Sequence, residues 1–282
     1  MIKISSVGIG CHKLQGGLEK NRSHKIISTA LDNNINYFDT APRYGDSEIL
    51  LGEFLKGQKD IIISSKVGLN ALNNSKLQKF QSYLKREVKL VLKNNFDFAK
   101  RYLDNKLQLR YENNIKHLNL SSKSTKPKLI LSEDEIRSSL NTTLKNLKRD
   151  HLDLYFLHEP EQYINIQEIL GVFANLKNEG HVRFYGLGFH RSLTDRDNFD
   201  ESLINLSMFN KELISKDQSS NSLSIIHGAM GYYKYAMSEI EKNKYDGPLN
   251  FLRKLTELHP NKTFLTAPSN FHQISGLNLH KL

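Results

Sequence analysis

Residues 36–66 read NYFDTAPRYGDSEILLGEFLKGQKDIIISSK, and this stretch decides how the rest of the chain is arranged. A short apolar run ends in Asp39, and a loop containing Tyr44 follows it. A helix is expected to begin at Ser47, and a second apolar run ends in Lys66. The pattern predicts a strand, a loop, a helix and a strand. In a parallel β/α barrel the C-terminal ends of the strands open onto one face, where the chemistry takes place. We therefore expect Asp39, Tyr44 and Lys66 to converge on that face.

An acid, a phenol and an amine in one place are suited to proton transfer. The ordinary pKa of a tyrosine phenol is about 10, and an adjacent ammonium lowers it by favouring the phenolate. A carboxylate beside the ammonium keeps the lysine charged and orients it. Such a phenol is a credible general acid for a carbonyl oxygen that receives hydride. The alternative is a surface tyrosine, a solvated lysine and a helix-capping aspartate, since the spacing alone is not rare.

Four motifs resemble the aldo-keto reductase family: FDTAPRYGDSEILLGEFL at 38–55, IIISSKVG at 61–68, HLDLYFLHEP at 151–160 and GHVRFYGLGFH at 180–190. The resemblance spans most of residues 1–66 and 130–190 and weakens after them. It implies an oxidoreductase with four catalytic residues. Tyr44 would move the proton, Lys66 would lower the pKa of Tyr44, Asp39 would hold Lys66, and His158 would orient the substrate oxygen.

The length of 282 residues fits one (β/α)8 TIM barrel, so a single domain is expected over residues 1–282. Further strands are predicted at 5–10, 152–157, 182–188, 203–208, 222–227 and 263–267, and helices at 24–33, 136–147, 166–179 and 248–259. Ser23 is predicted to cap the first of these helices. Ser132 and Glu135 have the spacing of a capping box.

The net charge of +10 is local, because residues 71–130 hold 14 Lys and Arg against 4 Asp and Glu. Residues 69–130 are predicted to form a long, basic, partly helical insertion after the third strand. Since it leaves the catalytic end of that strand, it should lie over the active-site face. A basic wall favours an anionic or sugar-like substrate, such as a phosphorylated or acidic sugar. Alternatively, its lysines only solvate an exposed helix face. The chain also ends soon after the last helix, so this short C-terminus leaves the insertion to form the pocket wall.

The resemblance also implies NADPH or NADH as cofactor and no metal. The family commonly has a Ser-Asn pair at the end of the fifth strand, whereas this chain has Gly188-Phe189-His190, so His190 is the candidate to hold the nicotinamide carboxamide. The backbone at Gly228 is a candidate for the pyrophosphate. Ser269, Asn270 and Gln273 are candidates for the adenosine end.

The choice between NADPH and NADH depends on the segment after the eighth strand. NADPH-preferring relatives usually carry Lys or Arg there for the 2′-phosphate, but this chain has neither between Thr266 and His280. Three explanations stay open. A basic residue from elsewhere, such as Arg191, binds the 2′-phosphate, or NADH is the cofactor, or the preference between NADPH and NADH is weak.

We therefore expect an NAD(P)(H)-dependent oxidoreductase that interconverts a carbonyl (an aldehyde, ketone or sugar) and an alcohol. One alternative is a barrel of this family that senses nucleotide or regulates a partner without turnover. Another is an interaction protein whose basic insertion binds an acidic macromolecule; the chain has no recognised nucleic-acid module, so we expect no nucleic-acid partner.

The single cysteine, Cys11, rules out an internal disulfide and indicates a reducing compartment. We expect Cys11 to pack in the core rather than to act as a reactive thiol. No apolar run approaches the roughly 18 residues of a membrane span, and the N-terminus lacks the apolar region of a signal peptide. A cytoplasmic location with no membrane contact is therefore expected.

Overall fold

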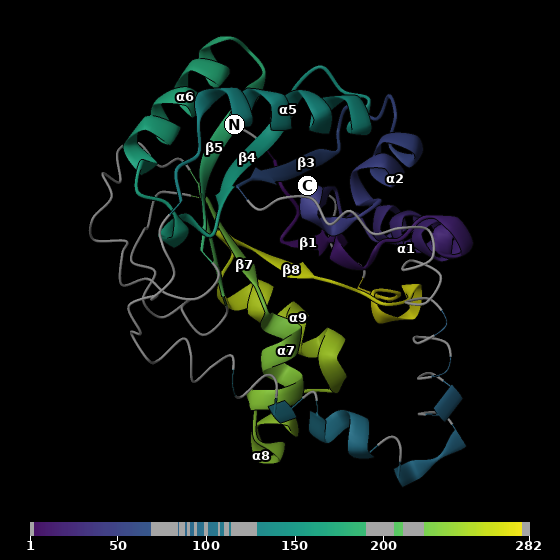
Figure 1. Cartoon of the computed structure of the whole chain (residues 1–282). Coiled ribbons are helices and arrows are strands. Elements are labelled where there is room, and N and C mark those ends of the chain that lie inside the picture. Colours follow the sequence, from purple (N-terminus) through teal and green to yellow (C-terminus); the bar gives the residue numbers. More distant parts are fainter. Residues whose placement is uncertain are drawn as a thin grey trace.

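The protein, a computed structural model, is described at residues 3–68, 129–189, 206–210 and 223–277, and in the insertion at residues 84, 88, 91–92, 95–98, 101–106, 108–109 and 113. Its strands form a closed, parallel barrel in sequence order (Figure 1). The ring closes where β1 pairs with β8, with Ile9 opposite Thr266. The predicted (β/α)8 barrel is therefore confirmed. The strands are β1 Val7–Gly10, β2 Tyr37–Asp39, β3 Ile62–Val67, β4 Leu152–His158, β5 Val182–Gly188, β6 Leu206–Asn210, β7 Leu223–His227 and β8 Lys262–Thr266.

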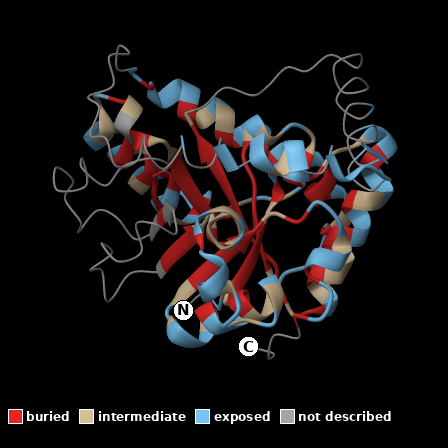
Figure 2. Cartoon of the chain, turned by 90° about the horizontal axis from the view of Figure 1, so that it is seen from below, coloured by how far each residue is buried: buried red, intermediate tan, exposed pale blue. Residues whose placement is uncertain are grey.

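Helices cover the outside of the barrel, with their inner faces buried and their outer faces exposed (Figure 2). The predicted capping box is present at α5, where the Glu135 amide donates to the Ser132 hydroxyl and the Ser132 amide donates to the Glu135 carboxylate. The long helices are α1 Lys20–Asp32, α2 Ser47–Phe54, α5 Glu133–Leu147, α6 Ile166–Asn178 and α9 Gly247–Leu258. The short elements are α7 Ala229–Gly231, α8 Glu239–Lys242, the π-helical turn η8 Tyr232–Ala236, and the 3-10 turns η1 Cys11–Lys13, η2 Gly17–Glu19, η3 Pro42–Tyr44, η4 Pro160–Gln162 and η9 Phe271–Gln273.

The first helix begins earlier than predicted, and the prediction that Ser23 caps it is wrong. Ser23 lies inside α1 and is fully buried. Its hydroxyl accepts a hydrogen bond from the Gln15 amide at 3.0 Å and donates one to the Gln15 carbonyl at 2.8 Å. The hydroxyl therefore ties the loop after β1 to the interior of the helix instead of capping the N-terminus of the helix.

Helices α2 and α5 pack unusually closely at Gly52. A Cβ atom at this position would lie 2.1 Å from the carbonyl oxygen of Asn146 and 2.7 Å from the backbone of Leu147. Since both neighbours are backbone atoms, no side-chain rotation could make room. The absence of a side chain at Gly52 is therefore what allows the two helices to approach.

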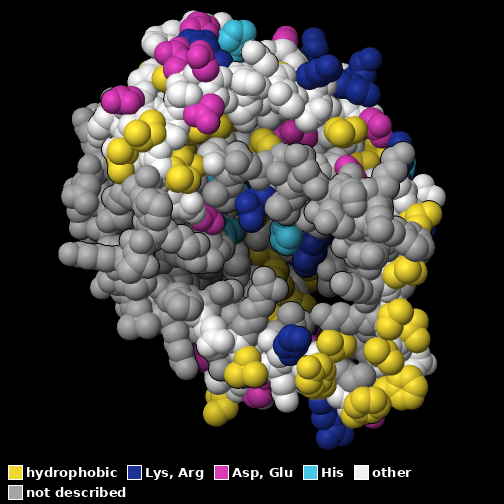
Figure 3. Space-filling model, in the orientation of Figure 1, with side chains coloured by type: hydrophobic (Ala, Val, Ile, Leu, Met, Phe, Trp, Pro, Cys, Tyr) yellow, Lys and Arg dark blue, Asp and Glu magenta, His cyan; other side chains and the backbone are white. Residues whose placement is uncertain are grey.

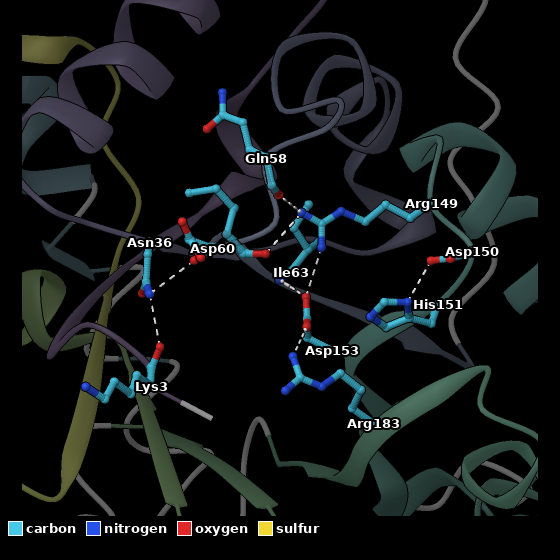
Figure 4. Close-up of polar contacts among 11 residues, drawn as sticks. Lys3, Asn36, Gln58, Asp60, Ile63, Arg149, Asp150, His151, Asp153 and Arg183 are labelled. Atoms are coloured by element: carbon cyan, nitrogen blue, oxygen red, sulfur yellow. Dashed lines mark hydrogen bonds and ion pairs between the residues drawn. The ribbon is translucent and has the colours of Figure 1, made fainter. Parts of the chain in front are cut away.

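At the N-terminal ends of the strands, the barrel is held by polar contacts around Asp153, a buried residue of β4 (Figure 4). Its carboxylate accepts hydrogen bonds from the Ile63 amide at 2.9 Å, from Arg149 at 3.0 Å and from Arg183 at 2.8 Å. Asn36 links the start of β2 to the carbonyl of Lys3 at 3.0 Å. The Asp153 contacts join β3, β4 and β5, and the Asn36 contact joins the start of β2 to the segment before β1, at the end opposite the C-terminal rim.

The predicted insertion at 69–130 lies mostly outside the described residues, so its boundaries and its position over the active-site face stay predictions. Its described residues 101–106 are helical. Asp104 forms an ion pair of 3.6 Å with Lys234 of η8, which places this part of the insertion beside the segment after β7. Among the described residues, no helix is both long and apolar enough to cross a membrane.

Candidate active site

Asp39 and Lys66 meet at the C-terminal rim of the barrel, where β2 and β3 end. The Lys66 Nζ atom donates to the two carboxylate oxygens of Asp39 at 2.6 and 2.7 Å and to the carbonyl of Thr40 at 3.0 Å. Both side chains are buried. The Ser64 hydroxyl donates to Asp39 at 2.7 Å and contacts the Tyr37 hydroxyl at 2.8 Å. The carboxylate is therefore held from two sides, and it fixes the position of the ammonium.

Burial lowers the pKa of Lys66, but the negative charge of Asp39, together with Tyr44, outweighs it and raises the pKa overall. The side chain is therefore an ammonium at neutral pH. This agrees with the expectation that Asp39 keeps the lysine charged.

Tyr44 is the last residue of η3, in the loop after β2. The Lys66 Nζ atom lies 5.0 Å from the centroid of the Tyr44 ring. Burial raises the pKa of Tyr44 above its ordinary value, Lys66 opposes this rise, and Asp39 adds to it. The expected lowering by Lys66 is present as one contribution, but the net shift is upward. Burial therefore outweighs the lowering of the Tyr44 pKa by Lys66. The phenol is protonated at neutral pH, which is the form that a general acid needs.

His158 ends β4 and lies beside Tyr44. The two ring centroids are 6.4 Å apart and the rings are perpendicular. The structure thus brings Asp39, Tyr44, Lys66 and His158 to one rim, although they are spread over more than a hundred residues of sequence. In the orientation of Figure 1 the surface is hollowed near its middle, and Lys or Arg and His side chains lie in the hollow (Figure 3).

A second histidine, His12, lies at the same site and was not among the residues that sequence analysis selected. Its ring centroid is 5.9 Å from that of Tyr44. The side chain is exposed to solvent, yet it is surrounded by enough protein that desolvation, followed by the charges of Lys13 and Lys66, lowers its pKa to about 4. The imidazole is therefore neutral at neutral pH. A signal was present in the sequence, because His12 lies two residues after the end of β1.

Cys11, which precedes His12, is fully buried, and its Sγ atom lies 3.4 Å from the carbonyl oxygen of Ile9. Burial raises the pKa of the thiol well above its ordinary value. Core packing, rather than a reactive thiol, is therefore confirmed for this residue.

The candidate cofactor residues lie on neighbouring loops where the structure describes them. Gly228 follows β7 directly and has a φ of +82°, which a side chain would strain. Ser269, Asn270 and Gln273 follow β8, and the Ser269 amide donates to the Gln273 side chain at 2.6 Å. These two loops share the rim because β7 and β8 are paired. His190 and Arg191 lie outside the described residues.

Basic side chains from the loop after β1 and from α1 contact the loop after β8. The Lys13 Nζ atom donates to the Ala267 carbonyl at 2.7 Å. Arg22 donates to the Ser269 carbonyl at 2.7 Å and to the Lys13 carbonyl at 2.8 Å, and it pairs with Glu19. Sequence analysis missed these contacts, since they join residues about 250 positions apart.

The Aldo/keto reductase family model matches residues 6–198. An uncharacterized oxidoreductase of Bacillus subtilis, YqkF, is 28% identical over 191 residues, which is 66% of this chain and 45% of that protein. The NADH-specific methylglyoxal reductase of Escherichia coli is 26% identical over 198 residues, which is 66% of this chain and 48% of that protein. The matched part of the chain thus spans about half the length of these relatives.

Solved structures show the same fold. An aldo-keto reductase from Bacillus halodurans in its holo form superposes with a TM-score of 0.64 at 20% identity, covering 99% of this chain and 88% of that one. An aldo/keto reductase from Klebsiella pneumoniae, in complex with NADP and acetate, gives a TM-score of 0.61 at 13% identity, covering 98% and 85%. Since the family model matches well over half of the residues, the chain belongs to the aldo/keto reductase family.

Proposed function

We propose that this protein is an NAD(P)(H)-dependent oxidoreductase that interconverts a small carbonyl compound and its alcohol, with Tyr44 as the general acid and base. The observation that carries the proposal is the buried ion pair of Lys66 and Asp39, whose ammonium lies 5.0 Å from the Tyr44 ring. A buried ammonium next to a phenol stabilises the phenolate that proton donation leaves behind.

The rim offers groups that suit a dinucleotide. Loops after the last two strands of such barrels frequently bind phosphate. Here the loop after β7 begins with the left-handed Gly228, and the loop after β8 is contacted by the ammonium of Lys13. Desolvation and the positive charges of Arg22 and Lys234 lower the pKa of Lys13, so a bound anion would relieve the repulsion among these cations. These features support NADPH or NADH as the cofactor.

The proposed mechanism assigns each step to a side chain. When bound, a reduced nicotinamide supplies the hydride for the carbonyl carbon. Tyr44 donates its phenolic proton to the carbonyl oxygen as negative charge develops there. Lys66 stabilises the resulting phenolate, Asp39 keeps Lys66 in place, and His158 donates a hydrogen bond that orients the oxygen. In the oxidation direction Tyr44 accepts the proton from the alcohol.

His12 extends this proposal. Its imidazole is neutral and 5.9 Å from the Tyr44 ring. A neutral ring adds no positive charge next to the phenol, so it leaves Lys66 as the cation that controls the charge of Tyr44. We propose that His12 shapes the wall of the substrate pocket.

The sensor alternative is less well supported, because a sensor has no need of a buried Lys66–Asp39 pair placed beside Tyr44. One assay separates the two functions. The oxidation of NADPH or NADH is followed by absorbance in the presence of a panel of aldehydes, ketones, sugars and sugar phosphates. Turnover of at least one compound is expected. Binding of the cofactor, measured by calorimetry, without turnover of any carbonyl would favour the sensor and contradict the proposal.

A further inference from the structure

A row of contacts leads outward from the catalytic tyrosine along the loop after β8. His12 lies beside Tyr44, and the next residue, Lys13, binds the carbonyl of Ala267 at the end of β8. Two residues farther along that loop, Arg22 of α1 binds the carbonyl of Ser269. The order along the row is therefore the reacting centre, the end of β8, and then the outer part of the loop.

The last member of the row is Lys25. Its Nζ atom lies 5.6 Å from the centroid of the Phe271 ring, which begins η9. The Lys25 side chain is exposed, and Phe271 is partly buried against the core. The ammonium thus lies over the ring, on a side chain that remains exposed to solvent.

Acidic residues are missing from the sequence positions closest to Lys25 on α1 and from the segment after β8. Residues 267–277 contain no Asp or Glu, and neither do the positions three and four residues away from Lys25 along α1. Arg22, one turn earlier, pairs with Glu19. No carboxylate in the described parts of the chain forms an ion pair with Lys25. Its positive charge is therefore available to an anion.

Lys20 provides an internal comparison on the same helix. Its Nζ atom also lies over a phenyl ring, 5.8 Å from the centroid of Phe54, but it is paired with Glu53 at 2.7 Å. Two lysines of α1 thus lie over aromatic rings, but within the described parts of the chain only Lys20, and not Lys25, is paired with a carboxylate.

We propose that Lys25 binds the 2′-phosphate of NADP(H) and gives this protein its preference for the phosphorylated cofactor. The inference rests on the proposed function, because it assumes that a dinucleotide lies along the row with its nicotinamide at Tyr44. A dinucleotide is extended, and its pyrophosphate lies between the nicotinamide and the adenosine. Lys13, near the reacting centre, therefore fits the inner phosphates, and Lys25, at the far end, fits the phosphate on the adenosine ribose.

This assignment explains how the chain manages without a basic residue between Thr266 and His280. The charge comes from α1, which lies against η9 in the fold although it is about 250 residues away in sequence. An ammonium is a strong partner for a phosphate dianion, and a hydrogen bond to a charged group contributes more than one between neutral groups.

The test compares NADP+ and NAD+ binding by calorimetry for the wild type and for Lys25→Ala, Lys25→Arg and Lys20→Ala. In the wild type, NADP+ should bind more tightly than NAD+. Lys25→Ala should weaken NADP+ roughly ten- to a hundredfold, as expected for the loss of one charge-assisted contact, and leave NAD+ unchanged. Lys25→Arg should keep most of the preference. Lys20→Ala, the matched control, should change neither affinity.

The remaining outcomes are distinct. If Lys25→Ala weakens both nucleotides equally or neither of them, the assignment of Lys25 is wrong. If the wild type binds NAD+ as tightly as NADP+ or more tightly, the inference is overturned while the proposed function stands. If the wild type binds neither nucleotide, the proposed function itself fails and the inference fails with it.

Discussion

The Lys66 ammonium lies 2.6 and 2.7 Å from the two oxygens of the Asp39 carboxylate, and both side chains are at most 4% exposed. Two charges removed from water depend on each other, since either one alone would be buried without a partner. The ion pair is therefore both a structural element of the rim and, in the proposed mechanism, the part that stabilises the Tyr44 phenolate.

Replacing Asp39 should expose this dependence. Asp39→Asn keeps the shape of the side chain but leaves Lys66 buried without a counter-charge. We therefore expect the free energy of unfolding to fall by about 3 to 5 kcal/mol. The measurement is urea unfolding at pH 7 together with turnover, which should also fall. In the double variant Asp39→Asn with Lys66→Met, part of the stability should return while activity does not. Equal stability of Asp39→Asn and the wild type would show that the pair is not held as described.

The imidazole of His12 should titrate at about pH 4 rather than 6.5. Because its pKa is lower in the folded state, the folded protein binds this proton less readily than the unfolded chain does. Its contribution to stability is therefore present above pH 6.5 and is lost as the pH falls towards 4. An NMR titration of the histidine ring protons, with His12→Gln to assign the resonance, measures the pKa. A midpoint near the ordinary value would contradict the partly desolvated position of His12 near the charges of Lys13 and Lys66.

Gly52 should tolerate no side chain. Gly52→Ala would place its Cβ atom 2.1 Å from the Asn146 carbonyl, so α2 and α5 must separate. We expect the free energy of unfolding, measured by thermal or urea unfolding, to fall by roughly 1 to 3 kcal/mol. Gly171→Ala in α6 is the control, because no atom of the described residues lies within 4 Å of the added carbon. This variant should be neutral or stabilising by about 0.5 to 1 kcal/mol. If the two variants behave alike, the close approach of the helices is not real.

The contacts around Asp153, at the N-terminal ends of the strands, should matter for the stability of the fold and not for catalysis. Asp153→Ala removes the acceptor of Ile63, Arg149 and Arg183 and leaves their donors unmatched. We expect a loss of about 3 kcal/mol in urea unfolding, with kcat per folded molecule unchanged. Asp150→Ala, whose side chain is 93% exposed, is the control and should change little. A fall in kcat without a fall in stability would point to a functional role that the fold does not explain.

Strand and helix patterns, together with the resemblance to the aldo-keto reductase family, were enough to predict the barrel. They also predicted that Asp39, Tyr44, Lys66 and His158 converge on one rim. The predicted strand at 182–188 coincides with β5, and the apolar stripe of α5 is buried as its spacing indicates. Asp39 and His158 end their strands and Lys66 is the next-to-last residue of β3, and the ends of parallel strands meet at one rim. Their positions therefore follow from topology.

Contacts between distant segments could not be predicted in this way. Ser23 has the residue type of a helix cap, but its hydroxyl binds Gln15, which becomes apparent only once the loop after β1 is folded. Lys25 carries no local pattern that points to Phe271. The sign of the pKa shift of Tyr44 was also beyond sequence, because it depends on the degree of burial and not on the neighbouring charge alone.

In the proposed mechanism the Tyr44 hydroxyl moves the proton, while Lys66, Asp39 and His158 hold the reacting groups in place and influence the pKa of that hydroxyl. Tyr44→Phe removes that hydroxyl and keeps the ring that lies 5.0 Å from Lys66. The decisive measurement is single-turnover oxidation of bound NADPH by a carbonyl substrate found for the wild type, with NADP+ affinity determined on the same samples. We predict that the variant binds NADP+ as the wild type does and that its rate falls by at least about a hundredfold. A variant that retains the wild-type rate would contradict the assignment of Tyr44.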